Sequence, residues 1–439
     1  MISHGALGTC HKKCQVGADF MVAYKQRLAD KDIHELYLHI PFCTQKCGYC
    51  DFASWPFKST TSVPSEYAAA LKDQLNELKA ANVCEDTETL YIGGGTPSAL
   101  PHELPDIIEC ACETCPTLRE KSCEVNPESA CDDLLSHMLR QGINRVSCGV
   151  QSTNADELKA LGRTHTPERA LERLCTLKAM GFSVSCDLMC AIPLQTDDSW
   201  LKSLHDVINC KVDHVSIYPL TIEKSTAFWA RYAHSHPKFN SEAIQAARMD
   251  IAHDVLESYG YKRYETSSYA QPNEQCDHNR GYWSAQTYIG LGPSAASMLT
   301  THAYRRLKQV WKTLPDLPSD IARIRITCTD SRASFIRNPR LSQRKASLEF
   351  LTLPQVLAED LMLEARLTSG IEPDVISYAE EVLGAQTVHA TFDRLIDLGL
   401  MVYNHGYLQA THKGWLLGNY IFEALLDLAP MELKSVLVP

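Results

Sequence analysis

The feature that most constrains the fold is an alternation of short apolar runs with segments of helical periodicity between residues 35 and about 220. One helical segment, 167–181, has Thr166 at the N-cap position, Pro167 in its first turn and Gly181 at its end, which are start and stop signals of a helix. Strands that alternate with helices predict a parallel sheet built from βαβ units. The apolar runs are 36–40, 89–93, 122–126, 145–150, 183–189 and 214–218. Six such units predict an α/β fold, an open (β/α)6 barrel with its chemistry at the C-terminal ends of the strands.

The rest of the chain divides by pattern. Residues 1–34 form a polar N-terminal extension without a clear period, and 35–235 hold the predicted barrel. Residues 236–346 are expected to close the barrel and to continue as a basic linker. Residues 347–439 show an amphipathic helix, a second helix, two short strands turning at "NHG" and a last helix, which predicts a small α+β, winged-helix-like domain. Its few basic residues argue against DNA binding.

The segment 302–346 is strongly basic, with eleven Lys or Arg residues against three Asp residues. Two interpretations stay open for it. It is either a solvated linker or insertion, or a basic patch that binds a partner or carboxylates such as propionates.

Composition and charge exclude several classes of protein. The net charge is −11, so nucleic acid is not an expected partner. No run of 18 apolar residues is present, and the N-terminus lacks the continuous apolar stretch of a secretory signal, so we expect a cytoplasmic protein. Its 18 cysteines then indicate metal binding or catalysis where they cluster. Those in apolar runs, such as Cys148, Cys186 and Cys190, are expected to act as small hydrophobic side chains.

A tight cysteine cluster follows the first predicted strand, in "HIPFCTQKCGYCDF" at 39–52. Cys43, Cys47 and Cys50 could bind three irons of a [4Fe–4S] cluster and leave the fourth iron open to a small molecule. A zinc site is the alternative, with His39 as a fourth ligand. Free core thiols are disfavoured, because the loop contains Pro, Gly and polar residues.

A glycine-rich turn, "YIGGGTPS" at 91–98, follows the second predicted strand. Three glycines let backbone groups approach a ligand closely, although a tight βα turn needs no ligand. Its place one βα unit after the cysteines strengthens the interpretation as a binding loop. Two other cysteine groups, "CHKKC" at 10–14 and "CACETC" at 110–115, have no such place and are not expected to bind metal.

Together, "IPFCTQKCGYC" and "IGGGTPS" resemble the radical S-adenosylmethionine (SAM) superfamily. Further stretches narrow the resemblance to the coproporphyrinogen III oxidase-like branch and, within it, to the HemW-type heme chaperones. These stretches are "EVNPES" (124–129), "RVSCGVQS" (145–152), "LGRTHT" (161–166), "CDLMCAIPLQT" (186–196), "HVSIYPLTIEKST" (214–226) and "CDHNRGYW" (276–283). The resemblance runs in order from about 35 to 298, with a weaker one over about 350–425. It implies the partial TIM barrel of radical SAM proteins, a [4Fe–4S] cluster, and SAM held by the open iron.

The resemblance also assigns residues to these cofactors. Cluster ligation falls on Cys43, Cys47 and Cys50. The residues that match SAM contacts of the family are Tyr37, Tyr49, Gly94, Gly95, Thr96, Glu124, Gln151, Arg163 and Asp187. Carboxylates can accept from ribose hydroxyls or an ammonium group, and a guanidinium can pair with a carboxylate, so the chemistry of these residues fits.

Position 52 separates two branches of the resemblance. Relatives that oxidise coproporphyrinogen resemble C-x3-C-x2-C-x-C, whereas Phe52 stands here in place of the fourth cysteine, as in the chaperone branch. Those relatives also have a longer N-terminal segment that lines the substrate pocket, and residues 1–34 do not resemble it. "HNRGYW" fits the HNxxYW pattern of the chaperone branch, which makes His278 a candidate axial heme ligand, with a structural histidine as the alternative. Cys276 is a weaker candidate, since a buried thiol explains it as well.

The sequence departs from the family pattern at two turns. "AIPLQT" has Ala191 and Leu194 where a glycine-rich "GLPGQT" is more usual. "IGLGPSAAS" has Pro293, and has Ala296 where many relatives have histidine. These changes could reshape the pocket but leave the cluster and SAM set intact.

Three functions therefore stay open, led by a heme chaperone that binds heme and transfers it to an acceptor heme protein. The first alternative is an oxygen-independent coproporphyrinogen III oxidase, and the second is a radical SAM enzyme of unknown substrate. Catalytic turnover of SAM, covalent attachment of heme and the choice between monomer and dimer are left open. We expect membrane association only at the periphery, through an acceptor.

Overall fold

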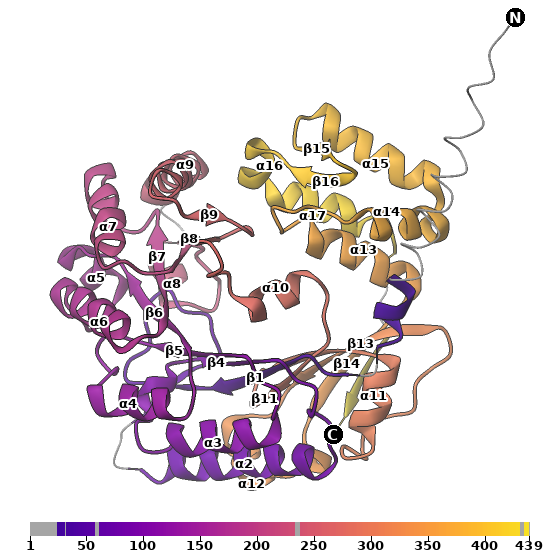
Figure 1. The fold of residues 1–439 in the computed structure, drawn as a ribbon, viewed down its shortest axis with the longest axis horizontal. Coiled ribbons are helices and arrows are strands. Elements are labelled where there is room, and N and C mark those ends of the chain that lie inside the picture. The colour runs from indigo at the N-terminus through magenta and orange to yellow at the C-terminus, as the bar shows by residue number, and fades with distance from the viewer. Residues whose placement is uncertain (1–23, 31, 58–60, 233–237, 431–433, 439) are drawn as a thin grey trace, which may run out of the picture.

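The computed structural model describes residues 24–30, 32–57, 61–232, 238–430 and 434–438. Within these residues the main feature is a 13-stranded sheet with the order β17-β14-β13-β12-β11-β1-β4-β5-β6-β7-β8-β10-β9 (Figure 1). The strands from β11 to β8 are parallel, and antiparallel strands extend the sheet at both edges.

The six strands predicted from the apolar runs are neighbours in this sheet, in chain order, which confirms the open (β/α)6 barrel. They are β1 (Glu35–Ile40), β4 (Thr89–Gly94), β5 (Glu120–Val125), β6 (Arg145–Gln151), β7 (Ser183–Cys190) and β8 (His214–Pro219). The helices around them are α2 (Val63–Ala80), α3 (Leu104–Thr114), α4 (Asp132–Arg140), α5 (Ala155–Leu161), α6 (Pro167–Met180), α7 (Asp197–Asn209), α8 (Ala227–Tyr232) and α9 (Glu242–Ser258). As expected, the Thr166 hydroxyl accepts from the backbone N–H of Arg169 at the start of α6, and Gly181 ends the helix in the left-handed conformation.

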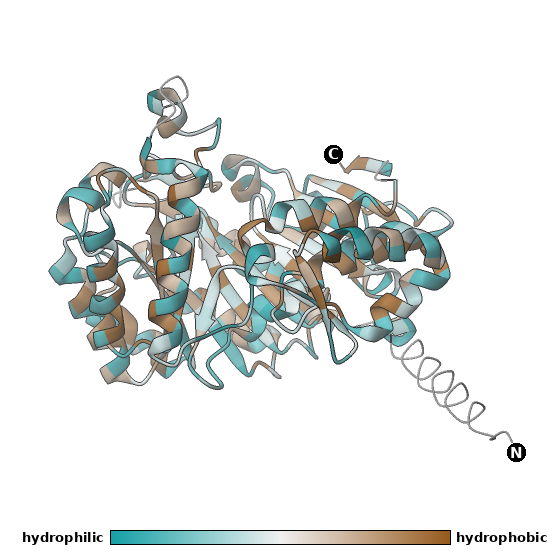
Figure 2. Cartoon of the chain, turned by 90° about the horizontal axis from the view of Figure 1, so that it is seen from above, coloured by the Kyte–Doolittle hydropathy of each residue, from teal (hydrophilic) through white to brown (hydrophobic). Residues whose placement is uncertain are grey.

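The strands of the barrel alternate between two kinds of side chain. Cys148 and Cys186 point away from the interior and are fully buried in the main hydrophobic core, as predicted for scattered cysteines. On the same strands Ser147 and Ser185 line the inside of the barrel. Figure 2 shows that the surrounding helices also carry both apolar and polar residues along their length. The main hydrophobic core of the sheet therefore lies on its outer face, and serine hydroxyls line part of its inner face.

Antiparallel strands continue the sheet beyond β1 and β8. They are β12 (Ala296–Thr300), β13 (Ile321–Cys328), β14 (Ala346–Thr352) and β17 (Lys434–Val438), which follow the parallel β11 (Tyr288–Leu291), and at the other edge β10 (Ser268–Ala270) and β9 (Lys262–Arg263). The shorter elements are β2 (Phe42–Cys43), β3 (Trp55–Pro56), η1 (Pro97–Ala99), η2 (Lys238–Asn240), α10 (Asp277–Trp283), α11 (Thr301–Lys308), α12 (Arg332–Arg337) and η3 (Leu341–Gln343).

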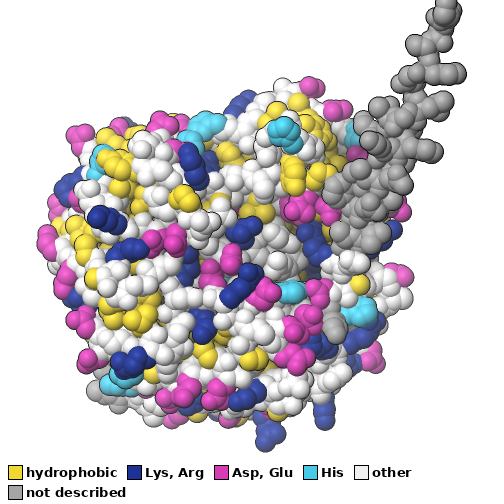
Figure 3. All heavy atoms as spheres, in the orientation of Figure 1, with side chains coloured by type: hydrophobic (Ala, Val, Ile, Leu, Met, Phe, Trp, Pro, Cys, Tyr) yellow, Lys and Arg dark blue, Asp and Glu magenta, His cyan; other side chains and the backbone are white. Residues whose placement is uncertain are grey.

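The basic segment 302–346 is part of this sheet, which corrects the expectation of a linker. β13 pairs with β12 on one side and β14 on the other. Its arginines form ion pairs, Arg323 with Glu359 at 3.0 Å and Arg325 with Glu349 at 2.9 Å. Figure 3 shows acidic and basic side chains interspersed on the visible face instead of one basic patch.

The C-terminal part follows the predicted order of elements and has its own hydrophobic core. Its elements are α13 (Leu353–Glu364), α14 (Pro373–Ala379), the π-helical turn η4 (Glu380–Gly384), α15 (Ala385–Asp397), β15 (Met401–Asn404), β16 (Tyr407–Ala410), α16 (His412–Leu416) and α17 (Gly418–Leu426). β15 and β16 form the expected two-stranded wing. The helices lie together on the opposite side of the sheet from α2, α3 and α12 (Figure 1).

Part of the predicted N-terminal extension is anchored to this C-terminal part. The Tyr24 side chain is buried, and its hydroxyl donates to Asp360 in α13. Arg27 pairs with Glu364 at 3.0 Å and with Asp360 at 3.5 Å. Arg323 of β13 also donates to Asp360, at 3.0 Å, so one buried carboxylate joins three parts of the chain.

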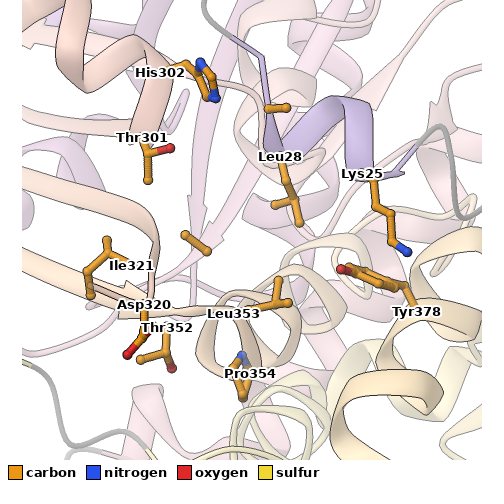
Figure 4. A pocket seen from close by; sticks show the side chains of 12 residues that line it. Lys25, Leu28, Thr301, His302, Asp320, Ile321, Thr352, Leu353, Pro354 and Tyr378 are labelled. Carbon is orange, nitrogen blue, oxygen red and sulfur yellow. The ribbon is translucent and has the colours of Figure 1, made fainter. Parts of the chain in front are cut away.

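A hollow of about 510 Å³ lies beside this anchor, between the N-terminal segment, the start of α11 and α13 (Figure 4). Lys25 extends toward the ring of Tyr378, with its Nζ 4.9 Å from the ring centroid. None of its lining residues belongs to the predicted cluster, SAM or heme set. Across the described part of the chain, no helix combines the length and the apolar character needed to span a membrane.

Candidate functional site

A cavity of about 750 Å³ runs along the inside of the barrel and reaches the loops at the C-terminal ends of its strands. Every residue predicted to bind the cluster, SAM or heme lines it: Tyr37, Cys43, Cys47, Tyr49, Cys50, Gly94, Gly95, Thr96, Glu124, Gln151, Arg163, Asp187 and His278. The fold thus brings together residues that lie up to 241 positions apart in the sequence, from Tyr37 to His278. Their roles as ligands stay predictions.

The cysteine loop starts in β2 and returns through β3. Cys43 is nearly buried, whereas Cys47 and Cys50 are half-exposed toward the cavity. Two polar neighbours contact the sulfurs: the Thr96 hydroxyl at 3.6 Å from Cys43 Sγ, and Arg163 Nη1 at 3.7 Å from Cys47 Sγ. Burial raises the pKa of the Cys43 and Cys50 thiols, so iron would bind by displacing their protons.

The three thiols do not converge on one point. Within the described ranges, no three side chains of His, Cys, Asp or Glu are close enough to hold a single metal ion. A [4Fe–4S] cluster does not require such convergence, because each thiolate binds a different iron. The cysteine loop therefore keeps the three thiol donors that a [4Fe–4S] cluster can use.

His39, the candidate fourth ligand of a zinc site, is engaged elsewhere. Its Nδ1 lies 3.0 Å from the Tyr37 hydroxyl and its Nε2 lies 2.8 Å from the carbonyl of Ala53. It does not line the cavity with the cysteines. Its role is to pack the first two βα loops together, which removes the observation that supported zinc.

The glycine turn locks onto the cysteine loop. The N–H of Gly95 donates to the carbonyl of Ile40 at 2.8 Å, and the N–H of Thr96 donates to that of Phe42 at 2.7 Å. A β-carbon on Gly95 would lie 2.6 Å from the Phe42 carbonyl oxygen. Gly94 has a φ of +113°, in a region that favours glycine. The turn is therefore a structural support for the cysteines as well as a wall of the cavity.

Two carboxyl groups with raised pKa values face the cavity. Glu124 accepts from the Tyr91 hydroxyl at 3.0 Å and from the Gly94 N–H at 3.1 Å. Burial and the nearby Asp187 raise the pKa of Glu124 to about 7. Burial raises the pKa of Asp187 to about 6, against the effect of its hydrogen bond from Ser147 at 3.0 Å. Both carboxylates can bind a cationic or hydroxyl-bearing ligand near neutral pH.

The remaining SAM candidates surround these carboxylates. Arg163 Nη2 donates to Asn126 Oδ1 at 2.8 Å and to the carbonyl of Gly149 at 2.7 Å, which fixes its guanidinium beside the cysteine loop. Gln151 ends β6 with a φ of 69°, and the pairing of β6 with β7 shifts register there. Tyr49 packs edge-on against Phe228, with ring centroids 6.2 Å apart.

His278 lines the cavity from α10, but both of its ring nitrogens have partners. Nδ1 lies 2.7 Å from the Thr89 hydroxyl, and Nε2 lies 2.9 Å from the Tyr282 hydroxyl. The ring stacks on Tyr91 at 5.3 Å, and burial lowers the pKa of His278 to about 3. This geometry favours the structural alternative for His278, and axial ligation would require the Tyr282 hydroxyl to move away.

Two neighbouring predictions have clear positions. Cys276 lines the cavity, but its Sγ donates to Glu120 at 3.4 Å and burial raises its pKa, which matches a buried thiol. Phe52 is 69% exposed and lines the cavity beside the cysteine loop. The position that distinguishes the two branches is therefore at the entrance, and the exposure of its ring does not fit a core residue.

The cysteine groups set aside as non-metal sites can be followed in part. Cys110 and Cys112 lie in α3, with their Sγ atoms near the carbonyls of Lys72 and Gln141. Neither lines the cavity. The "CHKKC" group lies outside the described residues.

Sequence reasoning missed several residues of the cavity. Its interior also includes Tyr91, Ser122, Asn126, Arg145, Ser147, Ser185, His214, Ser216, Tyr264, Ser268 and Tyr282. The signal was present in the strands, where Ser147, Ser185 and Ser216 alternate with apolar residues. Alternation of this kind marks an inward polar face, but without the strand register it does not show which serines meet.

An open (β/α)6 barrel with a three-cysteine loop and a glycine turn at its strand ends defines a radical SAM protein, and the model of the Radical SAM superfamily matches residues 37–207. The heme chaperone HemW of Mycobacterium tuberculosis (strain H37Rv) is 32% identical over 398 residues, which cover 89% of this chain and 94% of that protein. HemW of Escherichia coli is 36% identical over 60% of this chain and 70% of its own length. The chain belongs to the HemW family of radical SAM proteins.

A solved structure agrees on the fold. The coproporphyrinogen III oxidase HemN of Escherichia coli superposes with a TM-score of 0.71 over 92% of each chain, at 19% sequence identity. At this identity the likeness shows the shared fold alone. It places the C-terminal part and the barrel of both proteins in one common architecture.

Proposed function

We propose that this chain is a heme chaperone, which binds heme and transfers it to acceptor heme proteins. The observation that carries the proposal is similarity over 94% of the length of a relative named as a heme chaperone. Phe52 at the entrance of the cavity supports it, because the oxidising branch has a cysteine at that position.

The cofactors of the proposal are a [4Fe–4S] cluster on Cys43, Cys47 and Cys50, and SAM. When bound, the cluster supplies the electron that cleaves SAM in this superfamily. The chain's own residues hold and orient the two groups. Arg163 donates toward Cys47 and favours its thiolate, and Glu124 and Asp187 offer carboxylates to the cationic end or the ribose of SAM.

In the proposed function, heme binds beside α10, where "HNRGYW" faces the cavity. His278 Nε2 would be the candidate axial ligand of the iron, and the Tyr282 hydroxyl, 2.9 Å away, would have to leave it. Thr89 stays on Nδ1 at 2.7 Å and orients the ring, as partners of ligating histidines do. This geometry makes heme binding conditional on a movement of Tyr282.

Coproporphyrinogen III oxidation is the second candidate function, but the likeness to HemN at 19% identity shows a shared fold alone. Phe52 argues against it, since no fourth thiol stands there. Formation of protoporphyrinogen from coproporphyrinogen III by the reconstituted protein would replace the chaperone proposal.

An anaerobic heme titration of the reconstituted protein tests the proposal. Wild type is expected to show a saturable one-to-one Soret change, and His278→Ala is expected to weaken binding about tenfold or more. His165→Ala is a matched control, because His165 is also buried but does not line the cavity. Absence of specific binding by wild type would end the proposal, and equal binding by His278→Ala would move the ligand elsewhere.

The partner proposals follow from the same function. The partners are heme and a heme-accepting protein, and nucleic acid is not among them. We place the protein in the cytoplasm, as a monomer or dimer that reaches membranes only through its acceptor.

A further inference from the structure

The lower half of the cavity, toward the N-terminal ends of the strands, has no role in binding the cluster or SAM. In a closed TIM barrel, branched apolar side chains fill this space. Here the inward positions carry small hydroxyl groups instead: Ser122, Ser147, Ser185, Ser216 and Ser268 all line the cavity. The barrel interior is therefore a chamber lined by serine hydroxyls, together with aromatic residues such as Tyr91 and Tyr264.

Arg145 lies at the floor of this chamber. It is the first residue of β6, it lines the cavity, and only 5% of it is exposed. Its Nη1 donates to the Ser183 hydroxyl at 3.2 Å and to the Glu274 carbonyl at 3.1 Å. Its Nη2 is buried and has no hydrogen-bond partner among the described residues. A buried guanidinium nitrogen without a partner is costly, so it calls for an acceptor.

The groups around Arg145 do not supply that acceptor. Glu120 interacts with it electrostatically, but its oxygens accept from the backbone N–H groups of Asp277 at 2.8 Å and His278 at 3.0 Å. No ion pair with Arg145 is found within 4 Å in the part of the chain that the structure describes.

Asp187 also lines the cavity, and the positive charge of Arg145 acts to lower its pKa, but no ion pair joins the two among the described residues. His214 is fully buried between the Ser185 hydroxyl, 2.8 Å from Nδ1, and the Tyr264 hydroxyl, 2.9 Å from Nε2. Burial and the positive charge of Arg145 keep the pKa of His214 well below its usual value, so the imidazole is neutral. The floor thus combines one cation with neutral hydroxyl and imidazole groups, while Glu120 and Asp187 act on it electrostatically without an ion pair among the described residues.

We propose that Arg145 binds a carboxylate of a second ligand in the serine-lined chamber, below the cluster and SAM. A planar guanidinium matches a carboxylate in shape and charge, and the single unpartnered nitrogen of Arg145 can donate to one carboxylate oxygen. Two sources provide this chemistry: a propionate arm of heme, which rests on the proposed function, or a small free carboxylic acid, which does not.

The test compares heme with heme dimethyl ester, and adds sodium propionate, on the full-length reconstituted protein. The variants are Arg145→Met, which removes the charge, and Arg145→Lys, which keeps it. Arg173→Met is the matched control, because Arg173 is equally buried and donates to a backbone carbonyl but does not line the cavity. Thermal unfolding of each variant checks folding, and propionate binding is measured as an upward shift of the wild-type unfolding temperature.

Weakening of heme binding by about tenfold or more in Arg145→Met, with partial recovery in Arg145→Lys and no effect on the dimethyl ester, would support a propionate arm. A propionate shift that is present in wild type and lost in Arg145→Met would support a small acid, even if heme does not bind and the chaperone proposal fails. If Arg145→Met does not fold, the binding of heme and of heme dimethyl ester to wild type is compared instead. Tighter binding of heme than of the ester then supports recognition of a propionate arm. Equal binding of heme and its ester, together with no Arg145-dependent propionate shift, would overturn the inference.

Discussion

At the scale of single residues, the cavity contains two carboxyl groups whose pKa values burial raises toward neutral pH. Burial raises the pKa of Glu124 to about 7 and that of Asp187 to about 6. A carboxyl group whose pKa is raised in the fold costs stability once it ionises, because the folded state disfavours its charged form. Ionisation of the two carboxyl groups therefore lowers the stability of the ligand-free protein, and the same negative charges allow them to bind a cationic ligand.

Glu124→Gln is expected to raise the unfolding temperature of the ligand-free protein above pH 7 and to leave it unchanged below about pH 4.5. The reason is that the folded pKa of Glu124 is about 7 against an ordinary value of 4.5, so the cost appears as the pH rises through this window. Calorimetry between pH 4 and pH 8 measures it. Asp187→Asn is the control, since its window should end near pH 6. A pH-independent difference would contradict the assigned acidity of Glu124.

The candidate site was predictable where contiguous motifs carry it. Cys43, Cys47 and Cys50 share one loop, and their type and spacing alone indicate a cluster. His278 was harder, because its partners Thr89 and Tyr282 decide its role and hydrogen bonds cannot be read from a motif. The Arg145 floor was missed because a strand's first residue reveals nothing about a cavity until the register is known.

At the scale of elements, short apolar runs between helical segments predicted the six barrel strands, and within several of them polar and apolar residues alternate with a period of two. The same pattern in "RIRIT", with Arg323 and Arg325 alternating with Ile324 and Ile326, marks β13. Net charge obscured it, since eleven basic residues favoured a linker. The arginines lie in a strand because carboxylates of β14 and α13 pair with them, which depends on tertiary structure.

The loop after β7 is strained at two positions where the sequence departs from the glycine-rich family pattern. Ala191 and Leu194 replace residues that are usually glycine in this family, and both have positive φ values, 55° and 68°. An L-residue in this region costs about 1–2 kcal/mol. Gln195 holds the loop, accepting at Oε1 from the Ala191 N–H at 2.9 Å and from Arg248 at 2.6 Å.

Leu194→Gly is expected to increase the free energy of unfolding by about 0.5–1 kcal/mol, the strain relieved less the extra entropy of glycine in the unfolded chain. Little packing is lost, because Leu194 is 67% exposed. Leu194→Ala is the matched control, as it shortens the side chain but keeps the β-carbon. Urea denaturation of the three proteins measures the difference. Equal stability of the Gly and Ala variants would show that the loop is not strained.

At the scale of the whole molecule, a buried ionic network joins the N-terminal segment, the sheet and the C-terminal part. Asp360 is fully buried and accepts from Tyr24 and Arg323, which lie 336 and 37 positions away. Sequence patterns could not predict this junction, because the partners share no motif and a buried charge is intelligible only with its counter-charges. The network fixes the C-terminal helices on the face of the sheet opposite α2 and α3 (Figure 1).

Asp360→Ala is expected to destabilise the protein by about 3–5 kcal/mol, since it removes the carboxylate shared by Tyr24, Arg27 and Arg323 and leaves the buried Arg323 with Glu359 alone of its two carboxylate partners among the described residues. Glu113→Ala is the control, because its ion pair with Lys79 at 2.8 Å is exposed and such pairs contribute about 0–1 kcal/mol. Chemical denaturation of both variants measures the contrast. Similar small losses in the two would mean that the network does not hold the parts together.

The central claim is that the protein binds heme and transfers it to an acceptor heme protein. A heme-transfer measurement tests this claim most directly. The reconstituted protein is loaded with one equivalent of heme under anaerobic conditions and mixed with the apo form of a heme protein, and the absorbance of the acceptor is followed. We predict that the acceptor gains heme as this chain loses it, while coproporphyrinogen III supplied to the same preparation stays unchanged. Formation of protoporphyrinogen, with no heme retained or transferred, would contradict the account.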